Sequence, residues 1–448
     1  MATVSAAPAA RRLDERAQVA LLTLAALVVR VGCVLFLAAP TDLHGGDAWW
    51  YLQNGADLVR AAEAGPLPTG PGYLLFVGVI GLLFPGPATL PAIQLAQAAL
   101  GALTVTGVYL LGRRIWSHRV GMVAGAVLAV SPAFVIESAQ IATETLFIFL
   151  LVAALAGYVS SAAPRARPPL ARDLAGVGVL FGLAALTRAA LLAFPPLLAT
   201  HGWRRAAGNR RQGLRLAGAM LLAFALTLAP WTVYNLARWD RFVVAAEGFA
   251  SFLWLGAQEE GWQGPQATDA ALGLTPDAPD AGRDFGGQAM ETIRADPLGY
   301  AGLRLRNLAE AVAQPHNTVY FGGESLKSAA ARWLADDRSL SGLLALSAME
   351  SFWPKLALYL FHYAGVIGGL AGMAVHRFAW TEGRSRSGWA FALYALIGYY
   401  LAVHVVLYVI TRYLFPLEAA WWLFAAFALC SAWERLAIRR RERLLREP

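Results

Sequence analysis

Long apolar runs separated by short polar segments dominate the pattern along this chain. A helix needs roughly 20 mostly apolar residues to cross the hydrocarbon core of a bilayer. Runs of that length, or close pairs of shorter runs, recur along most of the sequence. The pattern predicts ten membrane-spanning helices, at 18–39, 91–112, 120–137, 144–160, 174–187, 189–201, 215–232, 353–376, 389–411 and 413–433.

The arginines decide which side of the membrane each connection faces, because cytoplasmic loops carry an excess of basic residues. Six arginine clusters begin at Arg11, Arg113, Arg165, Arg204, Arg377 and Arg435. If all six are cytoplasmic, an even number of crossings separates each successive pair. This parity makes 174–201 two short crossings. It also makes 72–84 an interfacial or re-entrant helix, the usual outcome for apolar runs of about 10–14 residues.

The same parity places five segments at the outer face. They are the loop 40–90, the turn 137–144, the apex near Arg188, the loop from about 233 to 352, and the apex at Arg412. Apolar residues at helical spacing within the first loop predict a helix at 48–64 that lies in the membrane interface. A proline-rich connector then leads to the 72–84 helix, and the two helices form a juxtamembrane platform.

The long outer loop differs in composition from the rest of the chain, because acidic residues outnumber basic ones and turn-forming residues are frequent. Helices are predicted at 284–296 and 298–313, on either side of Pro297. We expect this region to cap the membrane site. The predicted parts are a cytoplasmic segment 1–17, a transmembrane module 18–232 that includes the outer loop 40–90, the extracytoplasmic region 233–352, C-terminal helices 353–433 and a basic cytoplasmic tail 434–448.

Composition agrees with an all-α polytopic membrane protein. The 448 residues are 58% hydrophobic and 15% charged, whereas soluble domains carry about 25% charged residues. The net charge of +8 comes almost entirely from arginine, since Lys327 and Lys355 are the only lysines. These arginines flank apolar runs and form no continuous face, which excludes nucleic acid as a partner. Cys33 and Cys430 stand alone, so a disulfide framework is also excluded.

Asp47 is the first candidate for chemistry. It precedes the predicted 48–64 helix, where an aspartate can cap the free backbone N–H groups of the first turn. Its setting also fits a general base that removes a proton from an acceptor hydroxyl. His44 lies three residues before it, and two glycines open the backbone around it. The outward position at the lipid boundary favours the functional interpretation.

Three further charged residues share the outer side of the predicted map. Glu144 begins a span, where a carboxylate favours the positive end of the helix and could also bind substrate. Arg188 and Arg412 both lie in a "TR" pair between apolar helices, against the positive-inside rule. The planar fork of arginine suits phosphate. Arg30, in the middle of the first span, is instead expected to form a structural ion pair.

Several reaction classes lack their motifs. The seven histidines are scattered without an HExxH pair, and no Walker loop or GxGxxG motif is present. This disfavours metalloproteases and nucleotide-dependent reactions. No cofactor is predicted with certainty. A divalent metal at Asp47 and Glu144 stays open, although no Asp-x-Asp pair supports it.

Landmarks along almost the whole chain resemble those of the C-type membrane glycosyltransferases. This group includes protein O-mannosyltransferases, the lipid A aminoarabinose transferase and bacterial dolichyl-phosphate-mannose-type enzymes. The landmarks are "GGDAWWYLQNGADL", "PTGPGYLLF", "VSPAFVIESAQIATETLFIFLL", "GLAALTRAALLAFPPLL", "APWTVYNLARWDRFVVAAEGFASFLWLGA" and "RYLFPLEAA". Their order and spacing are specific for the superfamily and not for a substrate.

The resemblance implies the C-type fold and a polyprenyl-phosphate-linked sugar as donor, with inversion at the anomeric carbon. It implies that Asp47 is the catalytic acidic residue of the first loop, Glu144 the second acidic position, and Arg188 a residue near the carrier phosphate. The predicted substrate- and lipid-phosphate-binding residues are Glu144, Arg188, Arg412, Tyr51, His44 and Tyr73. The acceptor is a hydroxyl of a glycan, lipid or protein. The predicted location is a bacterial plasma membrane, with the active site extracytoplasmic.

One departure from the family bears on the phosphate. Several relatives carry a basic residue before the prolines of the second platform helix, where this chain has "LPTGPGY". Phosphate binding would then rely on Arg188 and Arg412. Two other functions stay open at the level of sequence. One is a transporter or flippase of lipid-linked glycans, and the other a glycan polymerase or ligase that uses a polyprenyl diphosphate donor.

Overall fold

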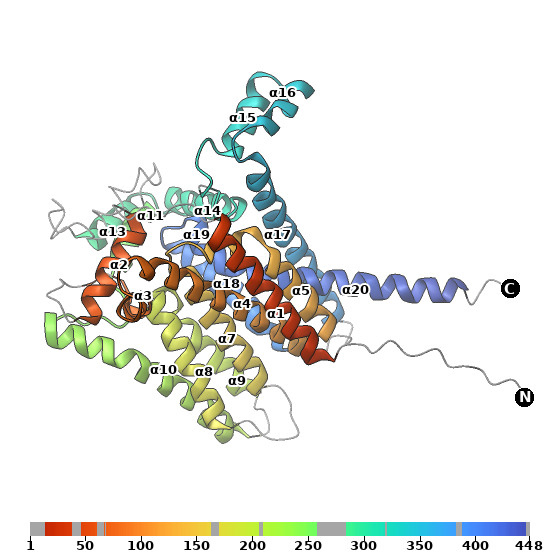
Figure 1. The fold of residues 1–448 in the computed structure, drawn as a ribbon. Helices are drawn as coiled ribbons and strands as arrows, with labels where there is room; N and C mark the ends of the chain where they lie inside the picture. The colour runs from red at the N-terminus through yellow and green to blue at the C-terminus, as the bar shows by residue number, and fades with distance from the viewer. Residues whose placement is uncertain are drawn as a thin grey trace, which may run out of the picture.

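The computed structural model describes residues 14–37, 46–60, 67, 69–162, 170–205, 209–257, 284–318, 320–381 and 388–444. Within these ranges every regular element is a helix (Figure 1). The predicted all-α class is therefore confirmed.

Within the described residues, seven helices are long and apolar enough to cross a membrane, which confirms a multi-pass membrane protein. Each coincides with one of the ten predicted spans. They are α1 (Glu15–Gly32, continued to Leu37 by a π-helical turn), α4 (Thr89–Ile115), α7 (Glu144–Ala162), α10 (Arg210–Trp239), α17 (Phe352–Thr381), α18 (Phe391–Val406), and α20 (Glu418–Leu444) with the short α19 (Thr411–Leu414) before it.

The other three predicted spans are shorter helices, so the count of ten crossings stays a prediction. Pro132 divides the predicted 120–137 span into α5 (His118–Val130) and α6 (Pro132–Glu137), since a proline inside a helix removes a backbone donor and clashes with the preceding turn. The predicted pair of short crossings is α8 (Ala171–Thr187) and α9 (Phe194–Arg205), and Arg188 lies at the junction as expected.

The two platform helices are present as α2 (Gly46–Val59) and α3 (Pro71–Leu83). α2 begins two residues earlier than predicted, and residues 61–64 of the predicted helix lie outside the described residues. The helices cross at very short range. A Cβ atom on Gly78 would lie only 2.2 Å from the carbonyl oxygen of Gly55. Glycine therefore sets the closeness of this crossing, as small residues do between membrane helices.

The region predicted to lie at the outer face (the outer region) contains α11 (Phe249–Ala257), α13 (Phe285–Ala295), α14 (Pro297–Ala313), α15 (Leu326–Asp336) and α16 (Leu340–Ala345). α13 and α14 match the helices predicted on either side of Pro297. Asp284 and Asp296 cap them, accepting hydrogen bonds of 2.8 and 2.9 Å from backbone N–H groups three residues later. In Figure 1, α15 and α16 extend beyond the end of α17, while α11, α13 and α14 lie nearer the bundle.

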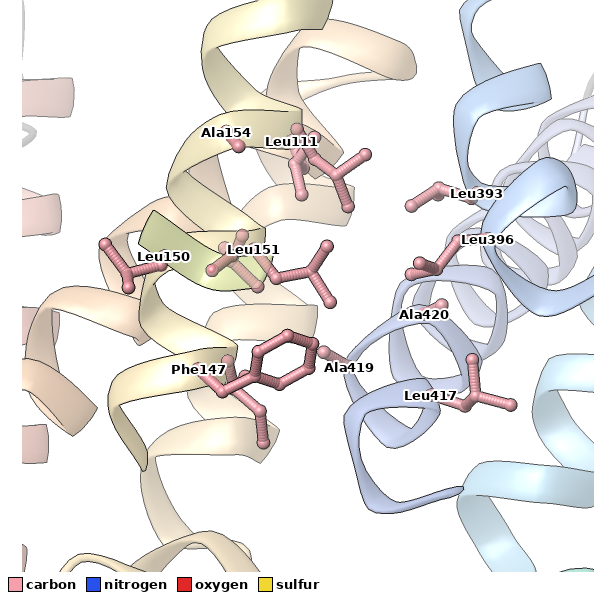
Figure 2. Close-up of a cluster of buried hydrophobic side chains, with 14 of the residues drawn as sticks. Leu111, Phe147, Leu150, Leu151, Ala154, Leu393, Leu396, Leu417, Ala419 and Ala420 are labelled. Atoms are coloured by element: carbon pink, nitrogen blue, oxygen red, sulfur yellow. The ribbon is translucent and has the colours of Figure 1, made fainter. Parts of the chain in front are cut away.

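The core lies where α4, α7, α18 and α20 meet. Figure 2 shows Leu111 of α4 and Leu151 of α7 opposite Leu396 of α18 and Ala420 of α20. All four are at most 2% exposed. Because lipid is as apolar as these side chains, close packing rather than removal from water holds such helices together. The tight core fixes the helix ends that carry the charged residues described below.

Arg30 is fully buried, and among the described residues no carboxylate forms the predicted ion pair with it. Within the described residues its guanidinium donates three hydrogen bonds of 3.1 Å to the backbone carbonyls of Ala26, Leu128 and Ala129. The last carbonyls of a helix lack intrahelical partners and carry partial negative charge. Since α5 ends just before Pro132, its free carbonyls supply the compensation that the sequence pattern assigned to a carboxylate.

The crossing of α2 and α3 predicts the effect of adding one side chain. Gly78→Val places methyl groups where the Gly55 backbone lies, so we expect a loss of about 1–3 kcal/mol of stability. Gly176→Val is the matched control, because no atom of the described residues lies within 4 Å of a Cβ added there. Thermal unfolding in detergent should show a lower Tm for Gly78→Val alone. Equal Tm values would contradict the close crossing.

Candidate active site

Four charged side chains from distant segments meet at one end of the bundle. Asp47 lies in the first turn of α2, Glu144 in the first turn of α7, Arg188 just after α8, and Arg412 in α19. Arg412 donates hydrogen bonds to both Glu144 and Asp47, and Arg188 donates to Glu144. The structure thus joins the four charged residues that the crossing parity placed on the same side.

Glu144 is the buried centre of this cluster, with no exposed surface. One carboxylate oxygen accepts from Arg188 Nη2 and Arg412 Nε. The other accepts from Arg412 Nη2 at 3.2 Å and from the Thr143 hydroxyl at 3.3 Å. A buried carboxylate is tolerated only when it is paired and hydrogen-bonded. Both requirements are met here, and the N-terminus of α7 adds favourable partial charge.

Exposure rises across the cluster from one side to the other. The side chain of Glu144 is 0% exposed, that of Arg188 14%, that of Arg412 26% and that of Asp47 55%. A charged ligand would therefore approach from the Asp47 side and would meet the outward edges of the two guanidinium groups. Glu144 lies behind them.

Contacts on two sides fix Arg188, one to the backbone just before it and the others to its side chain. A Cβ atom on Gly70 would lie 2.1 Å from the carbonyl oxygen of Leu186, so only glycine lets the connector before α3 approach the end of α8 this closely. On the other side, Arg188 Nε donates to the Thr143 hydroxyl at 2.9 Å. The guanidinium carbon also lies 5.8 Å from the ring centres of Phe147 and Tyr413, within cation–π range.

Tyr51 and Tyr73, both predicted to bind substrate, pack against each other beside the cluster. Their ring centres are 5.0 Å apart in an edge-to-face arrangement. Burial raises the pKa of both hydroxyls above the usual value for tyrosine, so both stay protonated at neutral pH. The Tyr73 hydroxyl donates to Gln97 at 2.7 Å. His44 lies outside the described residues.

Two buried amides of α4, Gln94 and Gln97, hold the turn that leads into Glu144. Gln97 donates to the carbonyls of Ser138 and Gln140 at 3.2 and 2.5 Å, and Gln94 donates to that of Ala139 at 2.7 Å. Sequence reasoning missed both residues. The available signal was a pair of amides three residues apart inside an apolar run, since polar residues within spans usually have a specific partner.

A second buried cluster connects the outer region to the same turn. Glu137 accepts from His316 at 2.8 Å and from the Asn317 amide at 3.1 Å. The Asn317 side-chain oxygen in turn accepts from Gln140 at 2.7 Å. The segment after α14 is thereby attached to the chain just before Glu144. Glu137 was also missed, although it lies in one of the landmarks quoted above.

Within the described ranges, no group of three or more His, Cys, Asp and Glu side chains lies close enough to hold a metal ion. In the site itself, the charges of Glu144 and Asp47 are paired with those of Arg188 and Arg412.

Residues 69–234 match the model of a family described as dolichyl-phosphate-mannose-protein mannosyltransferase. This segment contains Glu144 and Arg188, whereas Asp47 and Arg412 lie outside it. No curated protein matches the chain.

Among solved structures, the oligosaccharyltransferase of Archaeoglobus fulgidus in the apo form is similar over 97% of this chain and 52% of its own, with 18% identity and a TM-score of 0.56. The same archaeal enzyme, AglB, in complex with an inhibitory peptide and a dolichol-phosphate is similar over 96% and 52%, with 16% identity and a TM-score of 0.56. This chain thus spans about half the length of that enzyme.

ArnT from Cupriavidus metallidurans bound to undecaprenyl phosphate matches over 92% of this chain and 77% of its own, with 16% identity. Its TM-score of 0.38 is too low to show a shared fold by itself. The family match and the archaeal structures confirm that the chain has the fold of the C-type membrane glycosyltransferases, as its landmarks predicted.

The arrangement of the cluster predicts unequal effects of removing its two carboxylates. Glu144→Gln removes a fully buried anion that two partly buried arginines share, and breaking a buried pair costs about 3–5 kcal/mol. Asp47→Asn removes a half-exposed partner, and such pairs contribute about 0–1 kcal/mol. Thermal unfolding in detergent should show a clearly lower Tm for Glu144→Gln than for Asp47→Asn. Similar losses in both variants would contradict the described arrangement.

Proposed function

We propose that this protein is a membrane glycosyltransferase that moves a sugar from a polyprenyl phosphate carrier to a hydroxyl acceptor on the extracytoplasmic side. Transfer inverts the anomeric carbon, and Asp47 is the general base. The observation that carries the proposal is the meeting of two arginines and two carboxylates from four segments, with one carboxylate open to solvent. The C-type fold and the mannosyltransferase family match support the reaction class.

The carrier phosphate would bind at the outward edges of Arg188 and Arg412. Guanidinium groups bind phosphate oxygens through paired, charge-assisted hydrogen bonds. Donors already fixed in place stabilise the negative charge that grows on the departing phosphate. The dolichol-phosphate in the archaeal oligosaccharyltransferase structure supports a lipid phosphate as the class of carrier.

The two carboxylates differ in what they can do. Glu144 is buried and both of its oxygens accept hydrogen bonds, three of them from arginine. It therefore holds the arginines in position and has no room for an acceptor hydroxyl. Asp47 is half exposed and faces the approach side, so a hydroxyl can reach it. A carboxylate in such a place acts as a general base within hydrogen-bond distance of the proton that it removes.

The position at the end of the bundle suits a lipid-linked donor. α2 and α3 are the platform helices that the sequence predicts at the outer membrane interface, and they carry Asp47, Tyr51 and Tyr73. A sugar on a lipid phosphate presents its anomeric carbon at that depth. The segment after α14, attached through His316 and Asn317, would bound the acceptor side.

The test compares wild type with Asp47→Asn in detergent, supplying radiolabelled polyprenyl-phospho-sugars and an acceptor extract, and counting released polyprenyl phosphate. Loss of the base should lower turnover about 10²–10⁴-fold, without a comparable loss of Tm. Asp57→Asn is the matched control, because Asp57 lies on the same helix α2 outside the cluster. Its turnover should equal that of wild type.

Two results would contradict the proposal in different ways. Equal turnover in wild type and Asp47→Asn would remove Asp47 from the chemistry and keep the enzyme class. Absence of turnover by wild type with all polyprenyl-linked donors, together with movement of such lipids across vesicle membranes, would favour the flippase alternative.

A further inference from the structure

Arg412 contacts the proposed base as well as the buried carboxylate. Its Nε and Nη2 atoms donate to Glu144, and its Nη1 atom donates to Asp47. The proposed phosphate site and the proposed base therefore share one guanidinium. In the observed arrangement, the Arg412 nitrogen that a phosphate would use is bonded to Asp47.

We propose that Arg412 changes partner during the reaction. In the ligand-free protein its outward nitrogen holds Asp47, and the phosphate of the donor takes over that nitrogen when it binds. Asp47 is then released to accept the proton of the acceptor hydroxyl. This inference rests on the proposed function and assigns an order to it, because the base becomes free only once a lipid phosphate is present.

The guanidinium need not move for this exchange. Two of its nitrogen atoms are fixed by Glu144, which is 0% exposed, so the third points outward by geometry. The group that leaves is the Asp47 carboxylate, which is 55% exposed and can turn toward water. A half-exposed ion pair contributes little to stability, so a second anion can displace it.

Arg188 resembles Arg412 in holding Glu144, but it does not contact Asp47 among the described residues. Its Nε and Nη2 atoms donate to Thr143 and Glu144, and no hydrogen bond from its Nη1 atom is found within the described part of the chain. Both arginines thus use two nitrogen atoms to hold Glu144 and Thr143. Among the described residues, the third nitrogen of Arg412 donates to Asp47, which makes Arg412 the point where donor and base compete.

Charge is balanced through the step. In the ligand-free cluster two carboxylates face two guanidinium groups, and the donor phosphodiester adds one negative charge. The bond between the anomeric carbon and the phosphate oxygen breaks, and its electron pair stays on the phosphate. The acceptor oxygen bonds to the anomeric carbon, and its proton passes to Asp47. The phosphate gains the negative charge that Asp47 loses, and Arg412 is the cation that faces both.

The exchange predicts how free polyprenyl phosphate binds, a measurement that needs no sugar donor and no turnover. Since Asp47 competes for Arg412, Asp47→Asn should tighten binding of a short-chain polyprenyl phosphate about two- to fivefold at fixed salt concentration, the size expected from losing an exposed pair. The full chain in detergent is titrated, and each variant is first compared with wild type by Tm.

Charge repulsion between Asp47 and the phosphate would also tighten binding in Asp47→Asn, so a double-mutant cycle is required. Asp47→Asn is combined with Arg188→Gln and, separately, with Arg412→Gln. In the Arg188→Gln background Asp47→Asn should still tighten phosphate binding, because Arg188 does not contact Asp47 among the described residues. In Arg412→Gln the gain should be lost. Glu144 keeps one arginine partner in either background, which leaves the two backgrounds matched in charge. If Arg412→Gln does not fold, Arg412→Lys replaces it, and the gain should shrink because lysine lacks the fork.

If Asp47→Asn tightens phosphate binding equally in wild type, Arg188→Gln and Arg412→Gln, the exchange is overturned. The effect would then be charge repulsion between Asp47 and the phosphate. Absence of any gain in Asp47→Asn would overturn it as well. Failure of the proposed function is recognised separately. In that case wild type transfers no sugar in the turnover assay, whereas the binding cycle still shows that the effect of Asp47 depends on Arg412.

Discussion

The buried charge of Glu144 is the interaction on which the rest of this end of the molecule depends. A carboxylate removed from water at the start of α7 requires cations nearby. The chain supplies two, one from the junction after α8 and one from the segment before α20. Bringing them together joins the N-terminal and C-terminal halves of the bundle. The same contacts leave one nitrogen atom of each guanidinium not bonded to Glu144 or Thr143, and these are the atoms proposed to bind the phosphate.

The structure around Glu144 divides into a fixed part and an open part. Gln94 and Gln97 hold the turn before it, and Gly70 lets the connector of the platform pack against the end of α8. Asp47 belongs to the open part, since its side chain is 55% exposed and Arg412 is its charged partner among the described residues. A buried, hydrogen-bonded anion that holds the two arginines, beside a half-exposed carboxylate, is the arrangement that an exchange of partners requires.

Much of this was predictable from the sequence, and the reasons differ from residue to residue. Apolar runs identify helices because lipid leaves few alternatives, and the even number of crossings between arginine clusters placed Asp47, Glu144, Arg188 and Arg412 on one side. The pattern did not say which carboxylate is buried, because that depends on which side chains pack over it. Arg30 shows the same limit. Its charge in a span was recognised, but its partners are backbone carbonyls freed by the break at Pro132. The boundaries of the predicted domains and the capping role of the outer region stay predictions.

The central claim is that sugar transfer takes place where these four charged groups meet, and a structure determined by cryo-electron microscopy with a polyprenyl phosphate bound tests it most directly. The account predicts that the phosphate lies within hydrogen-bond distance of Arg188 and Arg412, with Asp47 no longer bonded to Arg412 and with Glu144 still holding both arginines. A phosphate bound elsewhere, with the contact between Asp47 and Arg412 intact, would contradict it.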